Sequence, residues 1–115
     1  MPNIRAIIAN VPVDDLEAAI PFYQELAGVT SVKRFSYEAL QLASIGPFLV
    51  YSGDWGDNPK QIATIIMESV AAVVATLEGA GGSLLAGPHD VPNGKRILAR
   101  HPDGSIFEYL EPPVQ

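Results

Sequence analysis

The sequence predicts an α+β fold in which two βαβββ modules form a curled eight-stranded mixed sheet around a cavity, with the helices outside. Three observations predict it: an internal repeat, helix and strand periodicities in the same order in both halves, and a 48% hydrophobic composition. A chain of 115 residues suffices for one compact domain. We expect a single domain over 1–115, with module one at 1–52, a linker at 53–60 and module two at 61–115.

The two halves of the chain match at an offset of 54 residues. Each copy has an apolar run, an acidic or hydroxyl cap, a helix-period stretch and a glycine. The matched pairs are Asp14 with Glu68, Leu16 with Val70, Ala18 with Ala72, Ile20 with Val74, and Gly28 with Gly82. The repeat predicts that both halves adopt the same local structure.

Module one begins with an apolar strand at residues 4–11, followed by a helix. Asp14 and Glu17 have the spacing of a capping box at the start of this helix. Pro21 lies inside the helical pattern, where it removes one hydrogen bond, so we expect a kink or a late helix start. The remaining strands of module one are expected at residues 29–35, 38–45 and 47–52.

Module two is predicted to follow the same order. Its strands are expected at residues 61–66, 83–86, 95–101 and 106–110, and its helix at residues 70–79. The residues from His101 to Gly104 have the proline and glycine positions of a tight hairpin turn. Glycine and proline residues over 87–94 indicate a flexible loop that covers the mouth of the cavity and carries His89.

Composition excludes several classes of function. The absence of cysteine excludes disulfides, iron–sulfur clusters, thiolate zinc sites and a cysteine nucleophile. A net charge of −6 has the wrong sign for a nucleic-acid-binding surface. The apolar runs are too short to span a bilayer, and the first residues do not have the pattern of a signal peptide. We therefore expect a cytoplasmic protein that binds neither nucleic acid nor membranes.

Two segments resemble the vicinal oxygen chelate superfamily, which contains glyoxalases, bleomycin resistance proteins and extradiol dioxygenases. The opening is Val11-Pro12-Val13-Asp14-Asp15-Leu16-Glu17, with Phe22-Tyr23 in the helix. The ending is Gly87-Pro88, then Arg100-His101-Pro102-Asp103-Gly104-Ser105-Ile106-Phe107-Glu108. The resemblance covers essentially the whole chain and implies the paired βαβββ modules that the repeat predicts.

The resemblance also implies four metal-ligand positions, on the first and last strand of each module. Of these, only the position of Glu108 holds a carboxylate. The first strand offers no donor, and the other two strands offer Gln61 and Tyr51, which are weak ligands. We therefore predict no cofactor and disfavour a divalent metal.

Glu108 is the first candidate site residue, because strand alternation places it on the face opposite Phe107 and Tyr109. In one interpretation Glu108 faces a ligand, either recognising it or acting as a general base. In the other, one of three arginines neutralises it: Arg5, Arg96 or Arg100.

The other candidates are histidines, an arginine and aromatic residues. His89 is a second possible catalytic residue, whereas His101 in its turn is expected to cap the chain or face solvent. The candidate ligand-binding residues, besides Glu108, are Arg5, Phe35, Phe48, Tyr51 and Trp55. As strand aromatics, Phe35, Phe48 and Tyr51 are more often part of a plain core. Trp55 could instead pack on a partner subunit or cover the junction between the modules.

Three functional hypotheses follow. The first is a metal-independent protein that sequesters a small, partly apolar molecule, as bleomycin resistance proteins do. The second is a lyase, isomerase or epimerase with Glu108 as base and His89 or an arginine polarising a carbonyl group. The third is an accessory or tailoring-pathway protein whose cavity is filled by side chains and whose role is interaction with a partner. The resemblance and the exposed edges of a curled sheet also predict a homodimer.

Overall fold

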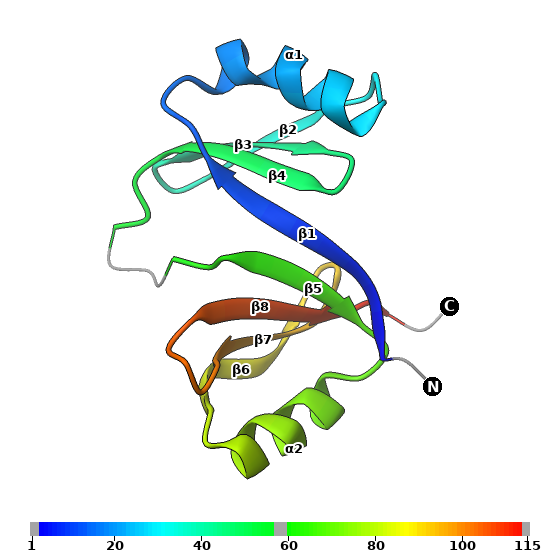
Figure 1. Ribbon diagram of the computed structural model, residues 1–115, viewed down its shortest axis with the longest axis vertical. Helices are drawn as coiled ribbons and strands as arrows, with labels where there is room; N and C mark the ends of the chain where they lie inside the picture. The colour runs from blue at the N-terminus through cyan, green and yellow to red at the C-terminus, as the bar shows by residue number, and fades with distance from the viewer. Residues whose placement is uncertain (1–2, 57–59, 114–115) are drawn as a thin grey trace. The chain divides into compact units, whose positions relative to one another are not determined.

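The computed structural model describes residues 3–56 and 60–113 and divides into two compact units (Figure 1). The α1 unit comprises residues 8–60, and the α2 unit comprises the residues up to Ile7 together with those from Gln61 onward. The elements are β1 (Ile4–Pro12), α1 (Leu16–Ala27), β2 (Lys33–Tyr37), β3 (Leu40–Ile45), β4 (Phe48–Gly53), β5 (Ala63–Met67), α2 (Val70–Ala80), β6 (Ser83–Val91), β7 (Gly94–Arg100) and β8 (Ile106–Glu111).

The α1 unit packs its helix on one face of its strands. β4 is parallel to β1 and antiparallel to β3, which is antiparallel to β2. Leu16 and Ile20 of this helix are buried against residues of β3 and β4. The buried strand residues of this core are Ala43, Ile45 and Val50.

The α2 unit repeats the arrangement. β8 is parallel to β5 and antiparallel to β7, which is antiparallel to β6. The buried side chains of α2 are Val70, Val73 and Leu77, and they pack on a core from the sheet. That core consists of Ile65, Met67, Ile97, Ala99 and Tyr109.

Both units therefore have the βαβββ order and the same strand pairing, which confirms the predicted fold class. The hydrogen-bonded order of all eight strands is β2-β3-β4-β1-β5-β8-β7-β6, and the sheet mixes parallel and antiparallel neighbours. β1 divides between the units, because its residues up to Ile7 belong to the α2 unit and the rest to the α1 unit. Residues 57–59 of the predicted linker lie outside the described residues.

The cap of α1 is Asp15, and the predicted capping role of Asp14 is wrong by one residue. The Asp15 side chain accepts a hydrogen bond from the Ala18 backbone N–H, which satisfies one of the free donors of the first turn. At the repeat offset of 54 residues, Asp15 corresponds to Ser69, the N-cap of α2. The helix runs through Pro21 and does not start late.

Substituting Asp15 with Ala is expected to lower the free energy of unfolding by about 1 kcal/mol, because an N-cap acceptor is lost. Asp14→Ala, at the neighbouring position, is expected to change it by less than about 0.5 kcal/mol. Urea denaturation followed by circular dichroism measures both. A larger loss for Asp14→Ala than for Asp15→Ala would show that the cap is misassigned.

The strand that follows α2 is longer than the sequence predicts. Residues 87–91 belong to β6, and the predicted loop over 87–94 is reduced to a tight turn between β6 and β7. The register of β6 against β7 shifts twice, between Leu84 and Ala86 and between Ala86 and His89. Glycine and proline are tolerated there because β6 is an edge strand and such residues accompany bulges. His89 thus lies on a strand and not on a flexible loop.

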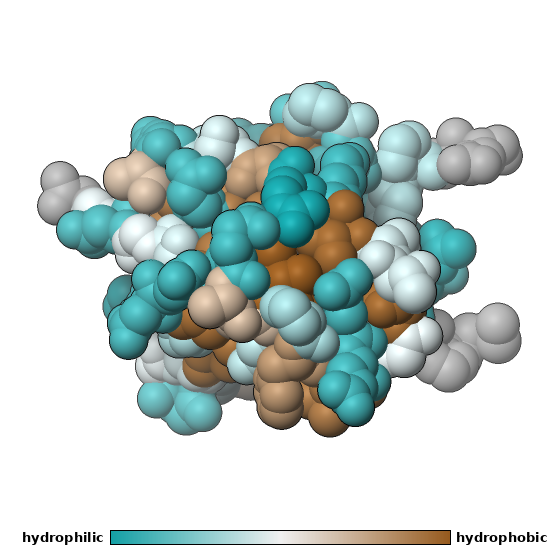
Figure 2. Space-filling view, turned by 90° about the horizontal axis from the view of Figure 1, so that it is seen from above, coloured by the Kyte–Doolittle hydropathy of each residue, from teal (hydrophilic) through white to brown (hydrophobic). Residues whose placement is uncertain are grey.

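The outer surface of α1 carries two exposed apolar side chains, Phe22 and Leu26, four residues apart. Figure 2 views this side of the molecule and shows brown apolar residues among teal hydrophilic ones. Neither helix of the described chain has the length and apolar character needed to cross a membrane.

Candidate functional site

The α2 unit carries a polar cluster on the face of its sheet opposite α2. Along β8, Phe107 and Tyr109 pack on the α2 side, so Glu108 points to the other side. Thr64 is the register partner of Glu108 on the neighbouring strand β5, and therefore shares this face. The alternation predicted for Glu108 is confirmed.

Glu108 makes a direct contact with each of the two adjacent strands. The Thr64 hydroxyl donates a hydrogen bond of 2.6 Å to Oε1 of Glu108. The Arg96 Nε–H on β7 donates to Oε2 and forms an ion pair with the carboxylate. We refer to Thr64, Arg96 and Glu108 as the Glu108 cluster, and its three members come from three adjacent strands, β5, β8 and β7.

The Glu108 cluster is half-buried. The Glu108 side chain is 20% exposed and the Arg96 side chain 28% exposed, while Thr64 and Leu98, the β7 residue opposite Glu108, are buried. An ion pair in such surroundings is screened less by water than one on the open surface. The charges balance, and both partners keep hydrogen-bonding capacity toward solvent, because a carboxylate accepts about four bonds and a guanidinium donates five.

Of the three arginines considered for Glu108, Arg96 is the one that pairs with it. Arg5 on β1 instead contacts Glu68, with 3.2 Å between Nε and Oε1, and both side chains are more than half exposed. Arg100 is exposed at the end of β7. Neither residue is a described ion-pair partner of Glu108.

His89 lies on the same face as the Glu108 cluster. Its register partner across the β6–β7 pair is Arg96, and directly opposed residues of an antiparallel pair project to the same side. The side chain is exposed at the edge of the sheet. His89, Arg96 and Glu108 thus form a row of titratable groups across three strands.

The Glu108 cluster does not fit a divalent metal ion. The single carboxylate is already paired with a guanidinium, whose positive charge repels a cation, and the adjacent Thr64 hydroxyl donates a hydrogen bond to the carboxylate. Nowhere in residues 3–56 and 60–113 do three or more His, Asp or Glu side chains gather in a way that could hold a metal. In the α1 unit, the position matching Glu108 in strand register is Leu49, since Asn10 pairs with Leu49 as Thr64 pairs with Glu108.

The aromatic candidates belong to the α1 unit and lie on two different faces. Tyr51 is 3% exposed and packs edge-on against Trp55, with 5.4 Å between ring centroids, in a cluster with Leu40 and Leu42. Phe35 pairs with Leu42 and shares its face, where it is exposed. Phe48 instead packs against Tyr23 in the core beneath α1.

His101 occupies the predicted hairpin turn but does not face solvent freely. The turn forms as expected, with the Gly104 N–H donating to the His101 carbonyl oxygen at 2.9 Å. The imidazole turns inward, stacks on Phe107 and forms a hydrogen bond with the Tyr109 hydroxyl. Because side chains alternate along β8, the rings of Phe107 and Tyr109 both point toward α2. The His101 imidazole packs against these rings on the same side of the sheet.

Thr64 is the one member of the Glu108 cluster that the sequence patterns do not indicate. It lies 44 residues from Glu108, and a threonine in an apolar strand is ordinary. Only the offset repeat offers a hint, because Asn10 holds the equivalent polar position in β1.

The fold agrees with the comparison of this chain with known proteins. A sequence profile of the Glyoxalase/Bleomycin resistance protein/Dioxygenase superfamily matches residues 6–109. The chain therefore belongs to this superfamily, and the resemblance seen in its opening and closing segments is confirmed.

Solved structures show the same fold. An uncharacterized protein from Methanosarcina mazei is 30% identical, with a TM-score of 0.81 over 99% of this chain and 98% of that one. Methylmalonyl-CoA epimerase from Mycobacterium tuberculosis is 15% identical, with a TM-score of 0.63 over 97% and 89%. A Streptomyces coelicolor methylmalonyl-CoA epimerase variant in complex with 2-nitronate-propionyl-CoA is 17% identical, with a TM-score of 0.65 over 99% of both chains. No curated protein matches the sequence.

Proposed function

We propose that this protein is a metal-independent small-molecule-binding member of its superfamily, and that the Glu108 cluster recognises the ligand. One observation carries the proposal: a half-buried carboxylate is held by Arg96 and Thr64 on the sheet face that α2 leaves uncovered. Buried polar groups cost free energy unless they are satisfied, so a fixed and partly accessible ion pair is well suited to binding polar ligand groups.

The hydrogen-bond donors and acceptors that the cluster leaves free define which ligand groups it can bind. Glu108 accepts one bond at each oxygen from the protein, which leaves lone pairs for a donor on the ligand. Arg96 contacts Glu108 through Nε, and its terminal nitrogens supply donors for an acceptor. A ligand group with both a donor and an acceptor, such as an amide or a hydroxyl beside a carbonyl, matches this pair.

The test is native mass spectrometry of the protein purified without chelator. We expect an organic mass to survive buffer exchange with the wild type and with Glu25→Gln, an exposed control in α1. Glu108→Gln keeps the shape but removes the charge, so its retention of that mass should fall at least about tenfold, the scale of a charge-assisted hydrogen bond. Equal retention by Glu108→Gln, no retained mass, or a stoichiometric metal would each contradict the proposal.

A second candidate function is an isomerase or lyase with Glu108 as general base. The row of His89, Arg96 and Glu108 on one face favours it, because a base and a cationic donor are what proton abstraction beside a carbonyl requires. The Glu108 carboxylate would accept the proton from carbon, and Arg96 or His89 would donate a hydrogen bond to the developing enolate oxygen. The fold shared with methylmalonyl-CoA epimerases supplies a first substrate to try.

The two functions are separated by hydrogen exchange. The wild type and Glu108→Gln are incubated with methylmalonyl-CoA in D₂O, and the C2 proton is followed by NMR. Exchange with the wild type that is lost with Glu108→Gln would establish proton abstraction at this site. No exchange by the wild type counts against this epimerase chemistry and leaves ligand binding as the function tested by mass spectrometry.

A further inference from the structure

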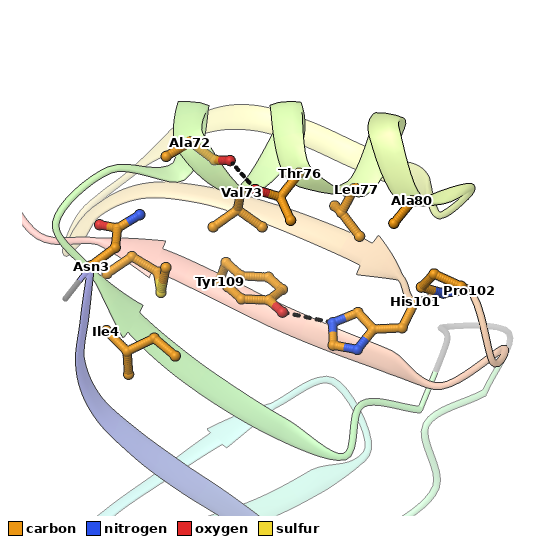
Figure 3. Close-up of a pocket in the computed structure, with 11 residues that line it drawn as sticks. Asn3, Ile4, Ala72, Val73, Thr76, Leu77, Ala80, His101, Pro102 and Tyr109 are labelled. Atoms are coloured by element: carbon orange, nitrogen blue, oxygen red, sulfur yellow. Dashed lines mark hydrogen bonds between the residues drawn. The ribbon is translucent and has the colours of Figure 1, made fainter. Parts of the chain in front are cut away.

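A recess lies in the α2 unit on the side of the sheet that faces α2, opposite the Glu108 cluster. Its volume is about 530 Å³, within the range typical of small-molecule pockets. Figure 3 shows α2 above the recess and strands β5 and β8 beneath it. Its walls are largely apolar and include Ile4, Met67, Val73, Leu77, Ala80 and the ring of Tyr109.

A histidine–tyrosine pair lies at one end of this recess. His101 Nε2 and the Tyr109 hydroxyl oxygen are 2.6 Å apart, and the imidazole stacks on Phe107 with 4.3 Å between centroids and 13° between planes. Tyr109 is only 7% exposed, and its hydroxyl points along the recess toward His101 (Figure 3). Burial raises the pKa of Tyr109, so the hydroxyl keeps its proton at neutral pH.

The pair leaves one hydrogen-bond donor for a ligand. A neutral imidazole has one N–H and tyrosine has one O–H, and the contact between them uses one of these two hydrogens. If the tyrosine donates to Nε2, the imidazole keeps its N–H at Nδ1; if the imidazole donates, the tyrosine hydroxyl hydrogen is free. In the second arrangement the Tyr109 hydroxyl, which lines the recess, is the donor available to an acceptor oxygen on a bound molecule.

The rest of the lining excludes charged ligands. No Lys, Arg, Asp or Glu is among the described residues that line the recess. Both polar atoms of the Asn3 side chain are engaged with the backbone of Ser69, and the Thr76 hydroxyl donates to the Ala72 carbonyl oxygen. A carboxylate or ammonium group entering this recess would lose its hydration without a charged partner.

We propose that this recess is a second small-molecule site, which binds an uncharged, mainly apolar molecule through one carbonyl or hydroxyl oxygen placed against the His101–Tyr109 pair. The site goes beyond the function proposed for the Glu108 cluster, because it lies on the opposite face of the sheet and shares no residue with it. The apolar walls supply most of the binding free energy, and the pair supplies orientation.

The test follows methyl signals of the full-length protein by NMR during titration with 2-octanone. The chain has two methionines, Met1 and Met67, so the ε-methyl of Met67 in the recess is readily assigned. We expect saturable shifts at Met67 and Leu77 with the wild type. Octanoate, which has the same chain length but carries a charge, should bind at least tenfold more weakly.

Two variants on α2 provide a matched pair. Ala80 is exposed and lines the recess, so Ala80→Phe should fill its end and raise the dissociation constant at least tenfold. Ala75 is also exposed on α2 but does not line the recess, so Ala75→Phe should bind as the wild type does. Tyr109→Phe keeps the ring and removes the hydroxyl, and should weaken 2-octanone binding by about tenfold.

The outcomes distinguish this site from the Glu108 cluster. Glu108→Gln should leave the 2-octanone titration unchanged, so a failure of either proposal does not imply a failure of the other. The second site is overturned if the shifts do not saturate, if Ala80→Phe binds as well as Ala75→Phe, or if octanoate binds as tightly as the ketone.

Discussion

Replacing Gly94 with alanine is expected to lower the free energy of unfolding by about 3 kcal/mol. Gly94 begins β7 with φ at +136°, a conformation that L side chains rarely adopt. An added Cβ would lie 2.0 Å from the Glu111 carbonyl oxygen and 2.9 Å from the Pro112 Cα. Both are backbone atoms, so the clash is relieved only by moving the β7–β8 pair that supports Arg96 and Glu108. Chemical denaturation followed by circular dichroism measures the loss.

Gly79→Ala is the matched control for this substitution. Gly79 lies within α2, and a Cβ built there has no neighbouring atom within 4 Å. Alanine is a better helix former than glycine, so this change should raise the free energy of unfolding by about 0.5–1 kcal/mol. The two substitutions are therefore expected to change the free energy of unfolding in opposite directions. A Gly94→Ala variant as stable as the wild type would contradict the strand geometry assigned to β7.

Ile97→Ala is expected to lower the free energy of unfolding by about 4 kcal/mol, which is in the upper part of the range for truncating a fully buried isoleucine. Ile97 is 0% exposed and packs in the core beneath α2, between Arg96 and Leu98 on the same strand. The truncation leaves a cavity on one side of β7, while the Glu108 cluster occupies the other side. Thermal and urea unfolding measure the loss of stability.

Two further substitutions calibrate that result. Ile97→Val removes one methylene group and should cost about 1 kcal/mol. Ile62→Ala removes as much as Ile97→Ala, but Ile62 is 53% exposed, so its effect should remain within about 0.5 kcal/mol. Similar losses for Ile62→Ala and Ile97→Ala would show that the core beneath α2 is not where the structure places it.

The fold of this chain was largely predictable because its signals are local and occur twice. The apolar stripe of α1, with Leu16 and Ile20, depends on neighbours three and four residues away, and so does the hairpin turn at His101. Because the repeat predicts the same order of helix and strands in both halves, the assignment of each half supports that of the other. The predicted N-cap was wrong by one residue because Asp14 and Asp15 are both of the residue type preferred at an N-cap. Only the backbone geometry distinguishes them.

The Glu108 cluster was only partly predictable because its contacts cross between strands. Alternation along β8 places Glu108 on the correct face, but strand register decides which side chains meet it. Each of the three arginines considered as partners had the right charge, and the pairing of β7 with β8 brings Arg96 to the carboxylate. Nothing in the local pattern around Thr64 indicates a partner 44 residues away.

The position of His89 shows a different limit. A Gly-Pro pair is most often a sign of a loop, and the segment was predicted as one. Here the pair lies on an edge strand, where bulges accommodate both residues and the strand continues to Val91. Whether a strand is an edge strand follows from the order of the whole sheet, which no single segment contains.

The division of β1 between the units has a consequence for the order in which the chain folds during synthesis. Asn3 is bonded through its side chain and its backbone carbonyl to Ser69 and Glu68, across up to 66 residues. Closing a loop of that length costs roughly 4 kcal/mol of chain entropy. The residues of the α1 unit have all been translated once Lys60 is made, whereas the first strand residues of the α2 unit wait for partners made later. On a ribosome, the unit that carries both candidate sites is therefore the last to fold.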